Sequence, residues 1–483
     1  MRAALSLVLF LAAAGTARAD FQQGLDAYNK GDYRVAFEQF KAAAEQGDAA
    51  AQFYLGECYN GGRGTVQDYV EALKWYRKAA DQQQVEAMDT LCTAYYWGQN
   101  IIKQDFTEAA GMCAGAALKG KAGSAFLAGY LYDLGKGVPA DAKQAAAFYR
   151  IAGDAGNVDA AELLGAMYFS GRGVQQDYAE AAKWNRKAAE AGRAYAQFLL
   201  GYSLDYGRGV QQDYAEAAKW YAKAAEQGNA GAMGALGYLY SQGSGVAKDE
   251  AMAVKLYLQA AEKNEPSVYA LLGWAYYQGA GTQQNIAEAL KWFRKAAEAN
   301  DDANSAYMVG YLLEDGKGVG QDYTEAAKWY RKAAEQGVLG AQEGLGRLYF
   351  GGLGVQQDYA EAAKWYRFPA QNGSTYAQYL MGYLFESGKG LAPNYPEAVK
   401  WYTLAAEKGD TRSQLALAYL LADEKSGSRD LVSAHMWANL AAAQLSGSER
   451  KAAEQQRDYL ATKLAPDQLV KAQQMARDFQ PKK

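Results

Sequence analysis

The sequence predicts an all-α protein: a right-handed superhelical α-solenoid of about twelve helix-turn-helix repeats, with a 36-residue period and a helical C-terminal cap. Three observations predict this fold. A tryptophan-centred block recurs about every 36 residues, a small residue follows each block at a fixed distance, and glycine pairs and acidic residues mark the helix ends. A chain of 483 residues could form several globular domains, but the regular recurrence favours one elongated array.

The tryptophan-centred block defines one helix of each repeat, which we call helix B. The block reads Glu-Ala-Ala-Lys-Trp-Tyr with small changes. Its tryptophan falls at Trp75, Trp184, Trp220, Trp292, Trp329, Trp365, Trp401 and Trp437. The slots between them hold Phe40, Met112, Phe148 and Leu256. This recurrence is far too regular for chance and indicates a repeat protein.

A small residue, about 17 positions after each block, defines the second helix of the repeat, helix A. It falls at Gly56, Cys92, Gly129, Gly165, Gly201, Gly237, Gly273, Gly310, Gly346, Gly382 and Ala418. Glycine inside a helix costs about 1 kcal/mol relative to alanine, so a recurrent one needs a reason. We expect the small residue to let helix A pack closely against helix B.

The connections carry helix stop and start signals. Helix A ends at Gly-x-Gly, as in Gly171-Arg172-Gly173, because glycine adopts positive φ. Helix B opens with Asp-Tyr-x-Glu, as at Asp177–Glu180, where Asp caps the free N–H groups and Glu is expected to reach back as a capping box. The stretch 97–113 lacks both Gly-x-Gly and the tryptophan. Pro369 falls inside a helix B, which is expected to kink or end early there.

These motifs resemble those of the Sel-1-like repeat family over about residues 21–443. The similarity lies in the spacing, the Leu-Gly pair, the Gly-x-Gly-Val loop, and Asp-Tyr-x-Glu-Ala-x-Lys-Trp-Tyr followed by Ala-Ala-Glu-x-Gly. The resemblance implies a tetratricopeptide-like fold and an adaptor or regulatory role, in bacteria often in envelope signalling, secretion or host contact. The tail also resembles the family's ending, with helices around Trp437, over about 448–463 and over 466–479.

The N-terminus is typical of a secretory signal. Arg2 precedes an apolar stretch, and Ala17-Arg18-Ala19 is an A-x-A cleavage site. We therefore predict a signal peptide over 1–19, a repeat array over 20–425, and a degenerate last repeat with a helical cap over 426–483. No later segment has the roughly 20 apolar residues that cross a bilayer. The predicted location is periplasmic or secreted.

The residue inventory argues against several kinds of chemistry. The formal net charge is −4 and the basic residues alternate with glutamate, which disfavours nucleic acid. His435 is the only histidine, and we expect it to be exposed or partly packed on the last helix B. With one histidine and no CxxC pair, we expect no catalytic site, no metal and no cofactor. One disulfide among Cys58, Cys92 and Cys113 is compatible with export, but their spacing does not select a pair.

The residue after the small position is where the family resemblance implies a concave groove. The candidate partner-binding residues are the rings Tyr130, Tyr202, Tyr238, Trp274, Tyr311 and Tyr383, the neighbouring rings Tyr307 and Tyr379, and the acids Asp133, Asp205, Glu314 and Glu386. Phe53, Phe126, Phe198 and Tyr419 occupy equivalent positions. One interpretation is core packing between A helices. The other is a binding groove whose acids favour a protein or peptide partner with basic groups.

The sequence thus favours a non-catalytic, extracytoplasmic interaction scaffold. A carbohydrate- or peptidoglycan-binding envelope protein is the alternative, because aromatic stripes also stack on sugars. A hydrolase is a third reading, which the missing catalytic constellation disfavours. The sequence does not name the partner.

Overall fold

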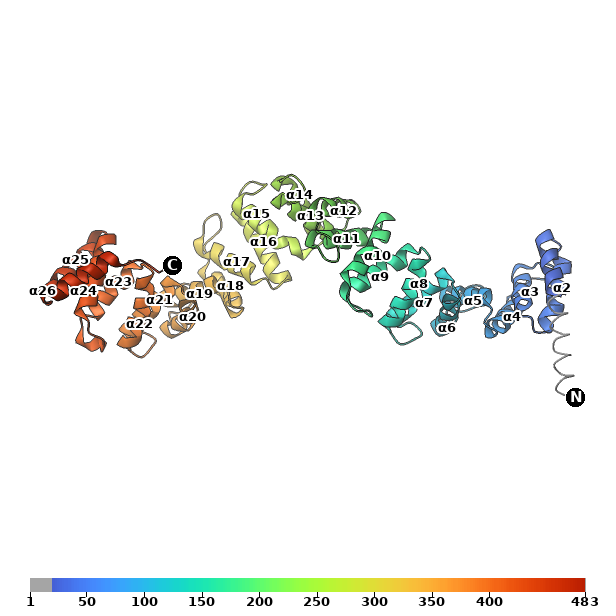
Figure 1. Ribbon diagram of the computed structural model, residues 1–483, viewed down its shortest axis with the longest axis horizontal. Coiled ribbons are helices and arrows are strands. Elements are labelled where there is room, and N and C mark those ends of the chain that lie inside the picture. The colour runs from blue at the N-terminus through green and yellow to red at the C-terminus, as the bar shows by residue number, and fades with distance from the viewer. Residues whose placement is uncertain (1–19, 483) are drawn as a thin grey trace. The chain divides into compact units, whose positions relative to one another are not determined.

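The computed structural model describes residues 20–482, apart from the side chain of Lys425. The predicted signal segment, residues 1–19, lies outside the described residues. Within residues 20–482 the secondary structure is helical and no strand is present. The chain divides into two units, residues 1–248 and 249–483. Within each unit consecutive helices lie side by side (Figure 1).

The first unit alternates A and B helices, beginning with helical residues 20–30. Its A helices are α3 (Ala49–Gly61), α5 (Val85–Trp97), α7 (Ala122–Leu134), α9 (Val158–Ser170), α11 (Ala194–Tyr206) and α13 (Ala230–Gln242). Its B helices are α2 (Tyr33–Glu45), α4 (Tyr69–Asp81), α6 (Phe106–Leu118), α8 (Ala142–Asp154), α10 (Tyr178–Glu190) and α12 (Tyr214–Glu226).

The second unit continues the same pattern and adds the C-terminal helices. Its B helices are α14 (Glu250–Glu262), α16 (Ile286–Ala299), α18 (Tyr323–Glu335), α20 (Tyr359–Gln371), α22 (Tyr395–Glu407) and α24 (Leu431–Gln444). Its A helices are α15 (Tyr269–Gln278), α17 (Ala303–Asp315), α19 (Leu339–Gly351), α21 (Thr375–Ser387) and α23 (Thr411–Leu420). Two 3-10 turns, η1 (Pro266–Val268) and η2 (Glu424–Ser426), flank α15 and α23. Helices α25 (Gly447–Ala461) and α26 (Pro466–Asp478) pack on α24, close to the predicted tail helices.

The small residue of helix A lies against a buried aromatic ring of the following helix B, as the sequence predicted. A Cβ atom added to the glycine would lie 2.6–2.8 Å from that ring in seven repeats. The pairs are Gly56–Tyr76, Gly129–Tyr149, Gly201–Tyr221, Gly273–Phe293, Gly310–Tyr330, Gly346–Tyr366 and Gly382–Tyr402. The ring is the residue after the tryptophan slot, so that residue fills the centre of each helix pair.

A disulfide replaces this glycine–aromatic pair in one repeat. Cys92 occupies the small position of α5, Cys113 occupies the ring position of α6, and the two sulfurs are bonded with their Cα atoms 4.7 Å apart. Cys58 is a free, buried cysteine, and burial raises the pKa of its thiol to about 11. The bridge thus crosslinks an internal repeat that lacks the Gly-x-Gly loop.

The two glycines of each Gly-x-Gly loop have different tasks. The first ends helix A with left-handed backbone, as at Gly171 (φ +74°), which confirms the predicted helix stop. The second approaches the first residue of the preceding repeat's helix B. A Cβ on Gly173 would lie 2.2 Å from the Ala142 carbonyl oxygen, and one on Gly209 would lie 2.1 Å from the Tyr178 carbonyl carbon. The second glycine is therefore a contact between repeats.

The predicted capping box forms only in its first half. Asp177 accepts hydrogen bonds from the backbone N–H groups of Ala179 and Glu180 at 2.9 and 3.0 Å, as expected. The Glu180 carboxylate does not reach back. It accepts a hydrogen bond from Trp184 Nε1 at 3.2 Å, one turn further along the helix. The expectation that the glutamate caps the helix was wrong, because the Asp177 backbone N–H, which the glutamate would accept from, already donates to the Tyr168 carbonyl at 3.1 Å.

The helix that carries Pro369 does not end early, contrary to the sequence-based expectation. Helix α20 runs to Gln371 and has the same 13 residues as its neighbours. Proline lacks an N–H group, but at this place in the last turn only one backbone hydrogen bond is lost. The Pro369 ring is buried where α18 has Ala333, and its carbonyl accepts from the Ser374 N–H at 3.0 Å.

One repeat has a polar side chain where its neighbours have the buried ring. Asn185 is 0% exposed, and neither its amide nitrogen nor its amide oxygen has a hydrogen-bond partner. We expect Asn185→Phe to stabilise α9 and α10 by about 1–3 kcal/mol, because it removes two unsatisfied polar atoms from the core. Native-state hydrogen exchange of these two helices measures the change, since long repeat arrays do not unfold in one step. Faster exchange in the variant would contradict it.

Candidate partner-binding face

The predicted binding rings lie on one position of successive A helices, and we call the surface they form in each unit the helix A face. In the first unit these rings are Tyr130, Tyr202 and Tyr238; in the second they are Trp274, Tyr311, Tyr383 and Tyr419. Tyr238 is 47% exposed, Trp274 39%, Tyr311 36% and Tyr419 44%. The other three are half-buried. The face therefore presents large exposed rings to solvent.

The half-buried rings also pack between neighbouring A helices. Tyr202 contacts Phe169 of α9 with ring centroids 5.5 Å apart, and Tyr383 contacts Phe350 of α19 at 5.8 Å. The core-packing interpretation thus applies to these rings, while the binding interpretation stays a prediction for the more exposed ones. Tyr130, Tyr202 and Tyr383 take part in inter-repeat packing, whereas the four more exposed rings leave much of their surface free.

The neighbouring rings, one turn earlier on each A helix, pack toward the core. Each lies 5.8–6.0 Å, centroid to centroid, from the buried ring of its own repeat. The pairs are Phe53–Tyr76, Phe126–Tyr149, Phe198–Tyr221, Tyr307–Tyr330 and Tyr379–Tyr402. These rings therefore pack against the centre of their own repeat, and their part in a partner contact stays a prediction.

The four predicted acids all accept a hydrogen bond from the buried tyrosine of their own repeat. The oxygen–oxygen distances are 3.4 Å for Asp133–Tyr149, 3.2 Å for Asp205–Tyr221, 2.7 Å for Glu314–Tyr330 and 2.7 Å for Glu386–Tyr402. Burial raises the pKa of these tyrosines, so their hydroxyls stay protonated and donate. The acids thus have a structural task that the sequence did not reveal.

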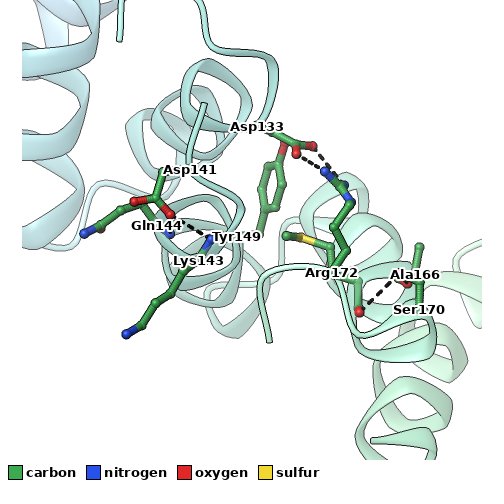
Figure 2. Close-up of polar contacts among 9 residues, drawn as sticks. Asp133, Asp141, Lys143, Gln144, Tyr149, Ala166, Ser170 and Arg172 are labelled. Carbon is green, nitrogen blue, oxygen red and sulfur yellow. Dashed lines mark hydrogen bonds and ion pairs between the residues drawn. The ribbon is translucent and has the colours of Figure 1, made fainter. Parts of the chain in front are cut away.

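Two of the acids are also paired with an arginine of the next repeat. Asp133 forms an ion pair with Arg172 of the following Gly-x-Gly loop, whose Nη2 lies 3.2 Å from Asp133 Oδ2 (Figure 2). Glu314 accepts from Arg347 Nε at 2.9 Å and from Nη2 at 2.6 Å. Each pair is a two-pronged contact between guanidinium and carboxylate. The charges of Asp133 and Glu314 are therefore satisfied within the chain.

Basic residues at the centre of the Gly-x-Gly loops are a feature that the sequence analysis missed. The Arg208 guanidinium lies 5.3 Å from the Tyr178 ring centroid and 5.1 Å from that of Tyr202. Lys389 lies 5.3 and 5.4 Å from Tyr359 and Tyr383 in the same arrangement. These cation–π contacts join the loop to the first residue of the preceding helix B. The basic residue that recurs between the two glycines of these loops could have indicated such contacts from the sequence.

The lone histidine is buried, which corrects the sequence-based expectation. His435 is 3% exposed in α24, and its Nδ1 has no hydrogen-bond partner. Burial lowers its pKa below the ordinary histidine value. It is buried because α25 and α26 both pack against α24. The sequence of α24 alone does not reveal these contacts between helices.

No helix among residues 20–482 combines the length and the apolar character that a membrane span requires. Nor do three or more His, Cys, Asp or Glu side chains gather there in a way that could hold a metal ion.

Twelve consecutive segments of the chain match the Sel1 repeat. They cover residues 19–48, 49–83, 85–120, 122–157, 158–192, 194–229, 230–265, 266–301, 303–338, 340–374, 375–410 and 411–444. The chain belongs to the Sel1 repeat family. Each segment holds one helix A and the following helix B, so the family's repeat coincides with the structural unit. Sel1 repeat proteins are generally non-catalytic scaffolds for protein interactions.

Solved Sel1 repeat structures resemble this Sel1 chain along most of its length. A protective antigen of uropathogenic Escherichia coli strains with an SLR fold is 32% identical, covers 92% of this chain and 94% of its own, and has a TM-score of 0.63. A Sel1 repeat protein from Oxalobacter formigenes is 28% identical over 63% of this chain and 88% of its own, with a TM-score of 0.48. Chitin synthase regulatory factor 3 of Schizosaccharomyces pombe is 36% identical over 115 residues, which are 23% of this chain and 12% of that protein.

Proposed function

We propose that this Sel1 repeat protein is a non-catalytic, extracytoplasmic scaffold or adaptor that binds a partner protein on its helix A face. The observation that carries the proposal is the exposure of Tyr238, Trp274, Tyr311 and Tyr419 at one position of successive A helices. Tyrosine and tryptophan dominate the energy of protein interfaces, because they offer a large contact area with few rotatable bonds. The helices that carry Trp274 and Tyr311 pack closely on their B helices through the pairs Gly273–Phe293 and Gly310–Tyr330, so little ordering is needed there on binding.

The extracytoplasmic part of the proposal is supported by the cysteines. Cys92 and Cys113 are bonded, and structural disulfides persist in oxidising compartments such as the periplasm. A signal peptide over 1–19 and a mature chain that begins at Asp20, with the array over 20–425 and the cap over 426–483, belong to the same proposal. The similar protein of uropathogenic Escherichia coli is a protective antigen, which supports a role in host contact, next to envelope signalling and secretion.

Removing three rings from the helix A face is expected to abolish partner capture. We expect Trp274→Ala, Tyr311→Ala and Tyr419→Ala together, all in the second unit, to weaken binding by about 100-fold or more, because several exposed interface rings are lost at once. Immobilised wild-type and variant chains are incubated with envelope extract, and bound proteins are quantified by mass spectrometry. The matched control changes three exposed rings away from the face: Tyr214, Phe368 and Tyr459 to alanine. Equal capture by both variants, with unchanged helical circular dichroism, would reject the face.

The same experiment separates this proposal from carbohydrate binding. A parallel arm uses isolated peptidoglycan and cell-wall polysaccharide in place of the extract. Retention on the polysaccharide that depends on Trp274, Tyr311 and Tyr419, without a captured protein, would replace the scaffold proposal with the carbohydrate-binding alternative.

A further inference from the structure

Asp205 has different surroundings from Asp133, the other predicted acid on the first unit's helix A face. It accepts one hydrogen bond, from Tyr221. In the part of the chain that the structure describes, no lysine or arginine forms an ion pair with it. Burial raises the pKa of its carboxyl, because desolvation disfavours the charged form and no cation opposes it. A cation that arrives with a partner would stabilise the charged form of such a half-buried carboxylate.

The chain itself shows which cation fits this type of site. At the equivalent positions, Asp133 and Glu314 hold Arg172 and Arg347. Arg347 lies 33 residues after Glu314, and the residue 33 after Asp205 is Tyr238. Arg172 lies 39 residues after Asp133, and the residue 39 after Asp205 is Ser244. Both positions that supply an arginine elsewhere are therefore uncharged beside Asp205, so the site is built like the others but lacks its internal arginine.

Aromatic rings lie near the unpaired carboxylate: Tyr206 is the next residue, and burial first, then the nearby Asp205, Tyr202 and Tyr238, raise the pKa of its hydroxyl. Tyr206 is 57% exposed and stacks near Tyr202 with ring centroids 4.5 Å apart, and Tyr238 is 47% exposed. A guanidinium group stacks on such rings while its N–H groups bind a carboxylate, which an ammonium group does less well. The Arg208 guanidinium lies 5.1 Å from the Tyr202 ring centroid and 5.8 Å from that of Tyr206, and a basic residue at this loop position does not preclude a second cation at the carboxylate. The equivalent Lys136 lies over Tyr130 in the repeat where Arg172 pairs with Asp133.

We propose that Asp205, with Tyr206 and Tyr238 beside it, is the docking site for an arginine side chain of a protein partner. The proposal rests on the scaffold function and names the chemistry of one contact within it. The internal pairs Arg172–Asp133 and Arg347–Glu314 are its templates, because they show a guanidinium bound to the same carboxylate position between adjacent repeats.

The test uses phage-displayed random 12-residue peptides as probes of the full chain. Peptides are selected on the wild-type protein, with and without counter-selection against Tyr238→Arg. That substitution places an arginine at the position that Arg347 has relative to Glu314. The new arginine should pair with Asp205 and so block the docking of a partner's arginine. We expect counter-selection to leave arginine-containing peptides. Affinities of synthetic versions with arginine, lysine or citrulline are then measured by fluorescence anisotropy.

We expect replacement of the critical arginine by citrulline to weaken binding to the wild-type chain by about tenfold or more, and lysine to restore it only in part. In Asp205→Asn, which keeps an acceptor for Tyr221, the arginine and citrulline versions should bind equally. Glu226→Gln is the matched control, because it removes one exposed charge from the same repeat and should leave the preference for arginine intact.

The outcomes separate the two proposals. If the wild-type chain selects no peptide in either selection, the scaffold proposal fails and the docking site fails with it. If peptides are selected but the preference for arginine is absent, equals that for lysine, or survives in Asp205→Asn, the docking site alone is overturned. The same holds if counter-selection against Tyr238→Arg leaves nothing.

Discussion

Gly173→Ala is expected to destabilise the junction between two repeats by about 3 kcal/mol or more, through overpacking and backbone strain. The added Cβ atom would lie 2.2 Å from the Ala142 carbonyl oxygen and 2.3 Å from the carbonyl carbon, and Gly173 has φ +73°. Ala142 begins α8, where Asp141 caps the backbone N–H groups of Lys143 and Gln144 at 2.9 and 3.0 Å (Figure 2). A shift of the Ala142 backbone away from the added Cβ atom would therefore break the hydrogen bonds by which Asp141 caps α8.

Gly192→Ala is the matched control for this prediction. Gly192 also has positive φ, +93°, but no atom lies within 4 Å of its added Cβ. It carries the backbone strain alone, for which we expect about 1–2 kcal/mol. Hydrogen exchange of α8 and α9 measures Gly173→Ala, and that of α10 and α11, which flank Gly192, measures Gly192→Ala. The thermal midpoint by circular dichroism is recorded for both variants. Equal losses would show that the second glycine serves only to bend the chain.

Loss of the Cys92–Cys113 disulfide is expected to cost about 3 kcal/mol of local stability, as for other bridges that close short loops. The two cysteines are 21 residues apart and fully buried. Replacement of both by serine removes the bridge and leaves two small polar groups in the core. Hydrogen exchange of α5 and α6 is expected to accelerate in this variant, and reduction of the wild-type chain under mild denaturant should have a similar effect.

The other repeats suggest that a glycine–ring pair can replace the disulfide. Cys92→Gly with Cys113→Phe installs the pair that Gly273 and Phe293 form in the second unit, where no acid accepts from the ring. We expect this double variant to regain a large part of the protection that the double serine variant loses. Equal protection in the two variants would mean that the cysteine positions are not equivalent to the glycine–ring pair.

Features that repeat within one helix pair could be predicted from the sequence. The close approach of glycine and helix B, the aspartate caps and the glycine helix stops each depend on residues that are near in sequence, and the structure confirms them. The expectations for Pro369 and His435 were wrong for a shared reason. Each depends on how neighbouring helices pack around one particular position, and the repeat pattern describes only what the repeats have in common.

The charge state of the helix A face could not be predicted from the same pattern. Asp133 and Asp205 have the same place in their repeats, yet one binds Arg172 and the other binds no cation among the described residues. The difference depends on a residue 33 or 39 positions later. Only coordinates show which of these side chains reaches back to the preceding repeat. Similarly, three cysteines allowed several disulfides until Cys92 and Cys113 were seen to share one core position.

The second glycine of each loop has a consequence for how such a chain can change in length. In eight of the nine loops it approaches backbone atoms at the start of the preceding helix B, where the first residue is Tyr, Phe, Ala or Glu; in the ninth, Gly318 approaches the side chain of Ile286. Where the contact is with main-chain atoms, it tolerates different side chains at that position. Whole 36-residue blocks are therefore exchangeable at this junction. Duplication or deletion of one block in the gene alters the number of binding positions and leaves the seams between repeats intact.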